Sequence, residues 1–191
     1  DAATRAAEAA AAADVAAGAA VEACGSAQSG EELFEPMRPP PGGAGAWDVL
    51  SGRPERAAAP PMPRRDVHAG GVWHRSVHVW LLDPHAGAVL VQQRSAGKDT
   101  FPGRWDISAA GHIGAGGRSR PTAVREAAEE LGVRCCEADL DFLFCCAAEG
   151  APIGGCNAYE DVYVLAADMG SLEVAAGEAE GAAAEGLAGG E

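Results

Sequence analysis

Hydrophobic positions along the chain gather in short runs that predict a β-sheet. Branched and aromatic side chains fill residues 76–82 and 88–94, and a turn sequence, Asp-Pro-His-Ala-Gly, separates the two runs. This arrangement predicts a β-hairpin. Further strands are expected at 46–50, 105–108, 141–146 and 161–165. Most of the apolar core is therefore expected in the middle and later parts of the chain.

One helix is predicted over residues 121–131. Pro121 suits the first turn of a helix, and Gly132 suits its end. Apolar residues recur at helical spacing and form one expected core stripe: Val124, Ala127, Ala128 and Leu131.

Three carboxylates occupy a second face of the same predicted helix. Glu126, Glu129 and Glu130 stand at positions i, i+3 and i+4, so like charges are neighbours on the helix surface and repel one another. A divalent cation would relieve that repulsion, because carboxylate oxygens are the ligands that magnesium and manganese prefer. The alternative interpretation of the helix alone is a solvated acidic face.

Composition divides the chain into three parts. Residues 1–44 are rich in Ala, Gly and Pro and are expected to form a low-complexity tail, because alanine buries little apolar area. The folded domain is expected over residues 45–170. Residues 171–191 are rich in Ala, Gly and Glu and form either a second tail or a degenerate end of the domain.

The 191-residue chain has a formal net charge of -14 and a single lysine. This charge excludes unspecific binding to nucleic acids or anionic membranes, which requires basic patches. No apolar run approaches the roughly 20 residues of a membrane span, and acidic residues interrupt the N-terminal segment, which argues against a signal peptide. The six cysteines lack C-x-x-C spacing, so free thiols in a reducing compartment, the cytoplasm or an organelle, are expected.

A glycine-rich loop, GHIGAGG, precedes the helix and begins at Gly111. Together the loop and helix read GHIGAGGRSRPTAVREAAEELGV, which resembles the box of the Nudix hydrolases. That pattern has a glycine, a later glutamate, and then Arg-Glu-aliphatic-x-Glu-Glu-x-Gly-aliphatic. Two positions depart from it: Gly117 replaces an acidic residue, and Ala127 replaces a larger aliphatic one.

The resemblance extends over residues 45–167, where RDVHAGGVWHRSVHVWLL and EDVYVL look like the Nudix branch related to isopentenyl diphosphate isomerase. The resemblance implies an α/β fold, an α/β/α sandwich around a mixed sheet. The strand and helix that would follow EDVYVL are not recognisable in the sequence. We therefore expect the domain to lack its C-terminal strand and helix.

The resemblance also implies roles for individual residues. A bound Mg²⁺ or Mn²⁺ would be held by Glu126, Glu129 and Glu130, with the backbone carbonyl of Ala110 or Gly111. The catalytic set would comprise Glu126, Glu130 and Arg125, which would orient the glutamates. Substrate contacts are expected from Arg94, Arg104 and His112, and a general base from Glu126 or from a late acid, Glu160 or Glu178. The expected partner is a small organic diphosphate, nucleoside-diphosphate-like or other, and a homodimer is a further expectation.

Two alternatives to a metal-dependent diphosphate hydrolase remain open. An isomerase acting on isopentenyl diphosphate is similar at His68, His74 and His112, which would be histidine metal ligands. That enzyme has a catalytic cysteine where this chain has Ala110, and alanine transfers no proton. The second alternative is a non-catalytic Nudix relative, which Gly117 and the degenerate C-terminal segment favour.

Overall fold

The computed structural model describes residues 30–97, 101–151 and 155–168, and the backbone of a strand at 181–186. The described residues from Glu31 onward belong to one compact unit. Its strands and helices are β1 (Leu33–Phe34), η1 (Ala44–Ala46), β2 (Met62–Pro63), α2 (Arg64–Ala69), β3 (His74–Asp83), β4 (Ala88–Gln93), β5 (Trp105–Asp106), β6 (Ala109–His112), α3 (Ser119–Leu131), η2 (Glu137–Asp139), β7 (Leu140–Glu149), β8 (Asn157–Ala166) and β9 (Gly181–Gly186).

The main sheet is mixed, as the resemblance to the Nudix family implied. Its central path runs β5-β4-β3-β8-β7, with β6 paired to β3 and β9 paired to β4. Only β3 and β8 run parallel within this sheet, and the other pairs are antiparallel. A separate two-stranded sheet joins β1 to β2.

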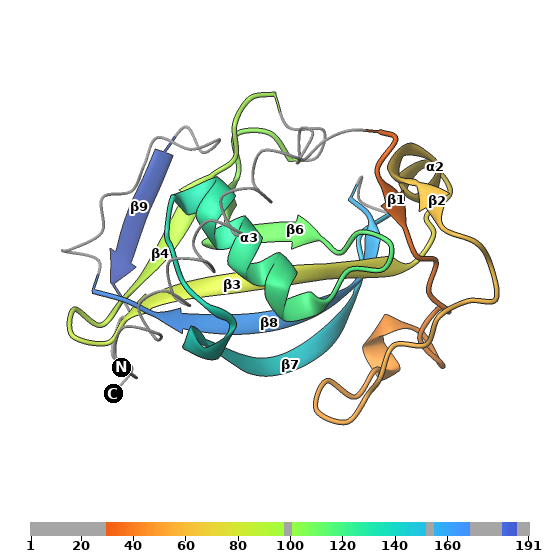
Figure 1. The fold of residues 1–191 in the computed structure, drawn as a ribbon, viewed down its shortest axis with the longest axis horizontal. Helices are drawn as coiled ribbons and strands as arrows, with labels where there is room; N and C mark the ends of the chain where they lie inside the picture. Colours follow the sequence, from red (N-terminus) through yellow and green to blue (C-terminus); the bar gives the residue numbers. More distant parts are fainter. Residues whose placement is uncertain (1–29, 98–100, 152–154, 169–180, 187–191) are drawn as a thin grey trace, which may run out of the picture. The chain divides into compact units, whose positions relative to one another are not determined.

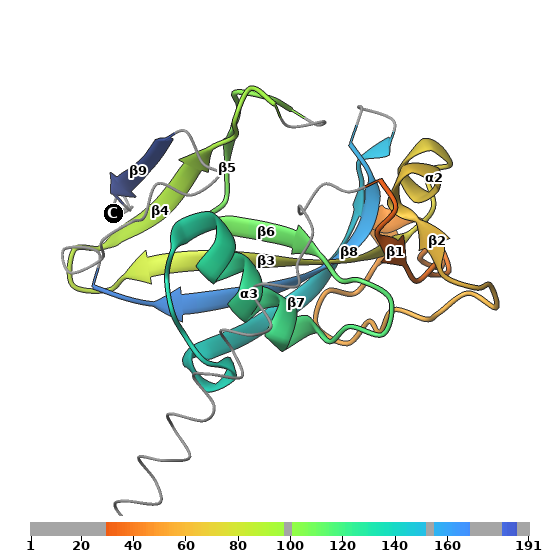
Figure 2. The ribbon, with the colours of Figure 1, turned by 45° about the horizontal axis from the view of Figure 1, so that its top comes forward.

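Strand β3 changes partner along its length, and this change positions the site. Its last two residues pair with β4, whereas Ser76 to Val79 pair with β6 (Figure 2). Where β4 and β6 diverge, the buried Ser108 hydroxyl accepts a hydrogen bond from Leu81 N at 2.8 Å and donates one to Leu90 O at 2.6 Å. Ser108 thereby satisfies backbone groups that the split would otherwise leave unpaired.

Helix α3 lies over β6 and β3 (Figure 1). Its buried apolar residues join a core cluster that includes Val77, Val79 and Leu81 of β3. The helix ends at Gly132, whose left-handed conformation, φ +69°, allows Gly132 and Val133 to donate to Ala128 and Ala127 carbonyls.

The predicted core stripe of this helix was partly wrong. Ala128 is exposed, whereas Ala123 and Glu126 are buried together with Ala127 and Leu131. A helical wheel assigns a carboxylate to the polar side, but β6 approaches α3 on the side where Glu126 projects. The buried face is therefore rotated toward the glutamates.

Three other sequence predictions differ from the structure. Residues 46–50 form no strand, because the Asp48 carboxylate accepts hydrogen bonds from the Leu50 and Ser51 amides and closes a turn. A strand does follow β8: β9 pairs with β4 over six positions. The expected domain start at residue 45 falls inside the compact unit, because β1 belongs to it and Phe34 is fully buried.

The second helical layer of the expected sandwich is not seen among the described residues. There, α3 covers one face of the sheet, and the short α2 packs instead on β1 and β2. The expected C-terminal helix lies outside the described part of the chain. No helix in that part is long and apolar enough to cross a membrane.

Candidate active site and a second cluster

Glutamate side chains of α3 converge on the beginning of the glycine-rich loop. Glu126 is only 3% exposed and lies directly against Gly111 of β6. A Cβ atom added at Gly111 would stand 1.8 Å from Glu126 Oε1, which is far inside contact distance. Glycine is therefore required at 111 for the helix carboxylate to reach the sheet.

Hydrogen bonds fix all three glutamates, which we call the carboxylate cluster (Glu126, Glu129 and Glu130). Arg125 donates to Glu129 Oε2 at 2.6 Å and to Glu126 Oε1 at 2.5 Å. Glu130 Oε2 accepts from Gln92 Nε2 at 2.8 Å and from Ala110 N at 3.0 Å. Arg125 thus lies where the expected orienting role requires it. The backbone of β6 meets Glu130 through the Ala110 amide, whereas the sequence predicted a contact of a backbone carbonyl with the metal.

Three carboxylates beside one guanidinium leave a surplus of negative charge in a half-buried position. Burial raises the pKa of Glu126 to about 8; Glu130 and Glu129 add to this rise, and Arg125 opposes it. Glu32, from the segment before β1, lies close enough to Arg125 and Glu129 for both to act on its pKa, which burial raises. The crowded oxygen donors suit a hard divalent cation such as Mg²⁺ or Mn²⁺.

Gly117 stands where the Nudix box has an acidic residue, and this departure has a steric explanation. Gly117 N donates to Gly114 O at 2.8 Å, and this closes a tight turn. A Cβ at Gly117 would meet Gly114 O at 2.8 Å and Ile113 Cγ2 at 3.2 Å. The turn therefore has no room for the acidic side chain of the family pattern.

Two arginines that the sequence suggested as phosphate ligands lie together at the end of the β4–β5 pair. Arg94 pairs with Asp106 at 2.7 Å, and its amide donates to Arg104 O at 2.9 Å. Arg104 is exposed. Arg94 directly follows β4 and stands two residues after Gln92, the residue that contacts Glu130.

The two late acids proposed as bases have different outcomes. Glu160 lies on β8, where Glu160 Oε1 is 3.5 Å from His78 Nε2, and Cys146 Sγ donates to Glu160 Oε2 at 3.4 Å. Glu178 lies outside the described residues.

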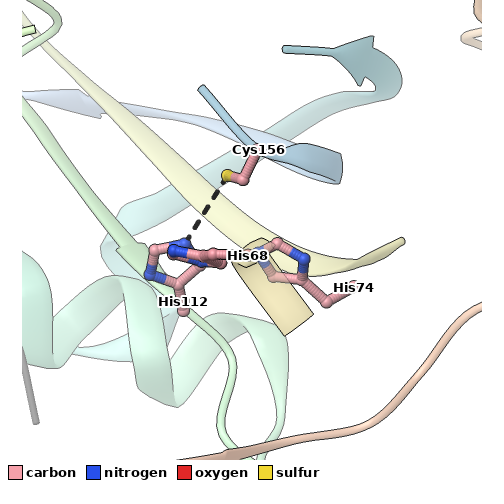
Figure 3. A group of neighbouring side chains, drawn as sticks. All are labelled: His68, His74, His112 and Cys156. Carbon is pink, nitrogen blue, oxygen red and sulfur yellow. Dashed lines mark hydrogen bonds between the residues drawn. The ribbon is translucent and has the colours of Figure 1, made fainter. Parts of the chain in front are cut away.

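His112 belongs to a second group of side chains, the His/Cys cluster (His68, His74, His112 and Cys156). One potential ligand atom from each residue lies within 4.8 Å of every other (Figure 3). Burial lowers the pKa of His74 to about 4, and it lowers the pKa of His112 well below the usual value. Sequence reasoning named the histidines through the isomerase resemblance but missed Cys156, because nothing in its spacing connects it to them.

Comparisons with known proteins agree with this geometry. The model of the NUDIX domain matches residues 72–183. Nudix hydrolase 3 of Arabidopsis thaliana is 40% identical over 124 residues, which are 62% of this chain and 16% of that protein. Uncharacterized Nudix hydrolase SCO1686 of Streptomyces coelicolor is 46% identical over 69 residues, covering 36% of this chain and 38% of that protein. The chain thus spans much less than two thirds of either relative.

A solved structure shares the fold. DR0079 from Deinococcus radiodurans superposes with a TM-score of 0.53 at 23% identity, covering 73% of this chain and 82% of that one. The two relatives are named as hydrolases, so the expected tie to the isomerase branch is not shown by them. The matched domain model covers more than half of the chain and includes β3 to β8 with the carboxylate cluster, and the chain belongs to the Nudix family.

Proposed function

We propose that this protein is a divalent-metal-dependent hydrolase that cleaves the diphosphate bond of a small organic diphosphate, with Mg²⁺ or Mn²⁺ held by the carboxylate cluster. Nudix proteins generally use divalent metals, and both relatives described above are named as hydrolases. The proposal concerns the domain in this chain.

The observation that carries the proposal is the close packing of Glu126 on Gly111. A buried carboxylate without sufficient positive charge nearby is costly, and among the residues that the structure describes Arg125 alone forms an ion pair with Glu126 and Glu129. A dication would balance the remaining charge. A solvated acidic face would instead leave Glu126 in water, whereas it is 3% exposed.

Each residue of the site then has a defined task. Arg125 holds Glu126 and Glu129 in fixed positions, and Gln92 with the Ala110 amide does the same for Glu130. A bound divalent ion would neutralise the diphosphate charge. It would also lower the pKa of a water molecule bound to it, so that a nucleophilic hydroxide is available near neutral pH. We propose Arg94 and Arg104 as contacts for the outer phosphate, because arginine donors match phosphate oxygens.

We propose Glu126 as the general base and keep Glu160 as the competing candidate. Glu126 stands within the carboxylate cluster, whereas Glu160 contacts His78 and Cys146. Substitution of each by glutamine separates them in the residual activity: a general base acts only when it is deprotonated, so only loss of the base removes the rise of kcat with pH on the acidic side of the profile. A profile changed by Glu160→Gln and not by Glu126→Gln would reverse the assignment.

The deciding experiment measures phosphate or nucleotide release from a panel of diphosphates with Mg²⁺, with Mn²⁺ and without metal. The panel contains nucleoside diphosphate sugars, dinucleotides, oxidised nucleotides and isopentenyl diphosphate, with every product identified. Glu129→Gln should lose metal-dependent cleavage, whereas the matched control Glu137→Gln, on the exposed η2, should retain it.

Other outcomes point to other functions. Cleavage of no panel member by a folded protein contradicts the hydrolase proposal and favours a non-catalytic relative. Isomerised isopentenyl diphosphate without phosphate release would establish the isomerase activity instead. Sedimentation of the same samples tests the predicted homodimer.

A further inference from the structure

A short segment that precedes the family match, residues 31–35, runs against the glycine-rich loop, and we call it the β1 segment. Leu33 O accepts a hydrogen bond from Ala115 N of that loop at 2.7 Å. The preceding carbonyl, Glu32 O, accepts a hydrogen bond from Arg64 N at 2.7 Å. The loop and the start of α2 therefore fix the main chain on both sides of Glu32.

The Glu32 side chain lies over the turn of the glycine-rich loop. It is partly buried, whereas its neighbours Glu31 and Leu33 are exposed. Glu32 Oε1 would stand 3.6 Å from a Cβ atom at Gly114, which is an ordinary contact distance. Gly114 O closes the turn by accepting from Gly117 N. A carboxylate is therefore present at this turn, although position 117 carries none.

Charged groups of α2 and α3 lie close to the Glu32 carboxylate. Burial has the largest effect and raises the pKa of Glu32, Arg125 and Arg64 lower it, and Glu129 raises it. Charges act strongly on one another in such a partly buried position, because little solvent screens them. Arg125 exerts the largest effect of the three charged groups, so the attraction between Glu32 and Arg125 links the β1 segment to α3.

Arg125 is the residue through which Glu32 reaches the carboxylate cluster. Its guanidinium group donates hydrogen bonds to Glu126 and Glu129. The donors of a guanidinium group are fixed in one plane, so the position of that plane determines where its acceptors lie. A further carboxylate beside the group restrains the plane, and this restraint holds the two glutamates in place for a divalent ion.

We propose that Glu32 is a positioning residue of the metal site: it orients Arg125, and Arg125 orients two glutamates of the carboxylate cluster. This inference rests on the proposed function, because it concerns the same metal site. Loss of a residue that supports metal ligands without binding the ion commonly costs about 10–100-fold in metal affinity or activity. Glu32 precedes the family match, which begins at residue 72, so the residues that orient the ion extend beyond the box.

The test measures Mn²⁺ binding to the full 191-residue chain by electron paramagnetic resonance, in which free Mn²⁺ gives the sharp signal. Glu32→Gln keeps the size of the side chain, removes its charge and should weaken binding about tenfold. Glu32→Asp retains the charge and should bind Mn²⁺ more tightly than Glu32→Gln.

Two acids of the β1 segment provide matched controls. Glu31 forms an exposed ion pair with Arg65, and Glu35 accepts a hydrogen bond from Gly116 N at 3.3 Å. Glutamine retains an acceptor oxygen at both positions. Mn²⁺ binding by Glu31→Gln and Glu35→Gln should therefore stay within about twofold of the parent.

Two further measurements separate positioning from folding and from direct ligation. In a chelating buffer, the unfolding temperature of Glu32→Gln should stay within about 2 °C of the parent. In the Arg125→Gln background, Glu32 has no guanidinium group on α3 to orient. Adding Glu32→Gln there should change the remaining Mn²⁺ affinity by less than about twofold.

Three results would overturn the inference while leaving metal binding by Glu129 intact. Glu32→Gln could bind Mn²⁺ as the parent does. Glu35→Gln could be weakened equally, which would assign the effect to anchoring of the β1 segment. Glu32→Gln could weaken binding equally without Arg125, which would make Glu32 a direct ligand. A parent that binds no Mn²⁺ would overturn the proposed function together with this inference.

Discussion

The carboxylate cluster and the His/Cys cluster are built in opposite ways. The first takes its three acids from one helix and sets them against one strand, and all its donors are oxygens. The second takes nitrogen and sulfur donors from four segments. The first carries surplus negative charge, whereas in the second burial lowers the pKa of His74 and of His112 and so favours their neutral forms. The comparison teaches that one small domain can keep hard and soft donor atoms in separate clusters.

The largest expected effect falls on the His/Cys side of this comparison. Phe34→Ala removes a fully buried ring that stacks on His74 and His112. Chemical denaturation should show a loss of about 3–5 kcal/mol in the free energy of unfolding. Leu33→Ala, in the same strand but 47% exposed, should cost less than about 1 kcal/mol. Equal losses in the two variants would show that Phe34 does not contribute through its buried contacts.

The next effect concerns the carboxylate side alone. Gly111→Ala forces Glu126 away from β6, so metal-dependent cleavage should fall on the order of 10–100-fold, as for other disturbed metal sites. Gly114→Ala is the matched control, because its added methyl group would meet nothing closer than 3.6 Å. Full activity in Gly111→Ala would contradict the assigned packing.

A smaller effect should appear in the pH dependence of stability of the metal-free protein. The pKa of Glu126 in the folded protein, about 8, exceeds its ordinary value of 4.5. The unfolded chain therefore loses this proton at a lower pH than the folded protein does. Stability should then fall as the pH rises from 4.5 to 8. Glu126→Gln removes this fall and should be more stable than the parent at pH 8 by roughly 1–2 kcal/mol, an estimate reduced for relaxation around the charge.

This result is measured by thermal unfolding in a chelating buffer, with Glu137→Gln as the surface control. A parent whose stability is flat between pH 5 and 8 would contradict the burial of Glu126. The same variant should lose metal-dependent activity, so stability and function would move in opposite directions.

The smallest effect tests the end of α3. Gly132→Ala places a methyl group at φ +69° and should cost about 1 kcal/mol. Glu129 and Glu130 stand in the last turn, so the apparent affinity for Mg²⁺ should weaken. An unchanged affinity would mean that the end of the helix does not position the carboxylate cluster.

The sequence predicted the parts of this molecule whose signal is local. The strands β3, β4, β7 and β8 were expected from branched and aromatic runs, and α3 was expected from spacing and its terminal residues. The glutamates followed from the same spacing. Burial of Glu126 could not be predicted, because it depends on which side of the helix β6 approaches.

Features formed by distant segments left little trace in the sequence. Strand β9 has the composition Gly-Ala-Ala-Ala-Glu-Gly, which lacks branched residues, so its strand conformation depends on backbone pairing with β4. Cys156 joins three histidines through the fold alone. Phe34 is a single aromatic residue in a weakly apolar segment, and only its contacts with β2 and the glycine-rich loop reveal its place.

The position of β1 has a consequence for how this domain should be delimited. The family match begins at residue 72, whereas the compact unit begins at Glu31. Phe34 and His68 both precede the match, and Leu33 O accepts a hydrogen bond from Ala115 N at 2.7 Å. A fragment cut at the family border would retain every glutamate of the Nudix box yet lose a histidine and the aromatic cover of the neighbouring cluster. The family match therefore covers the part of the domain that carries the glutamates. The packing of β1 shows that the folded unit also includes residues before the match.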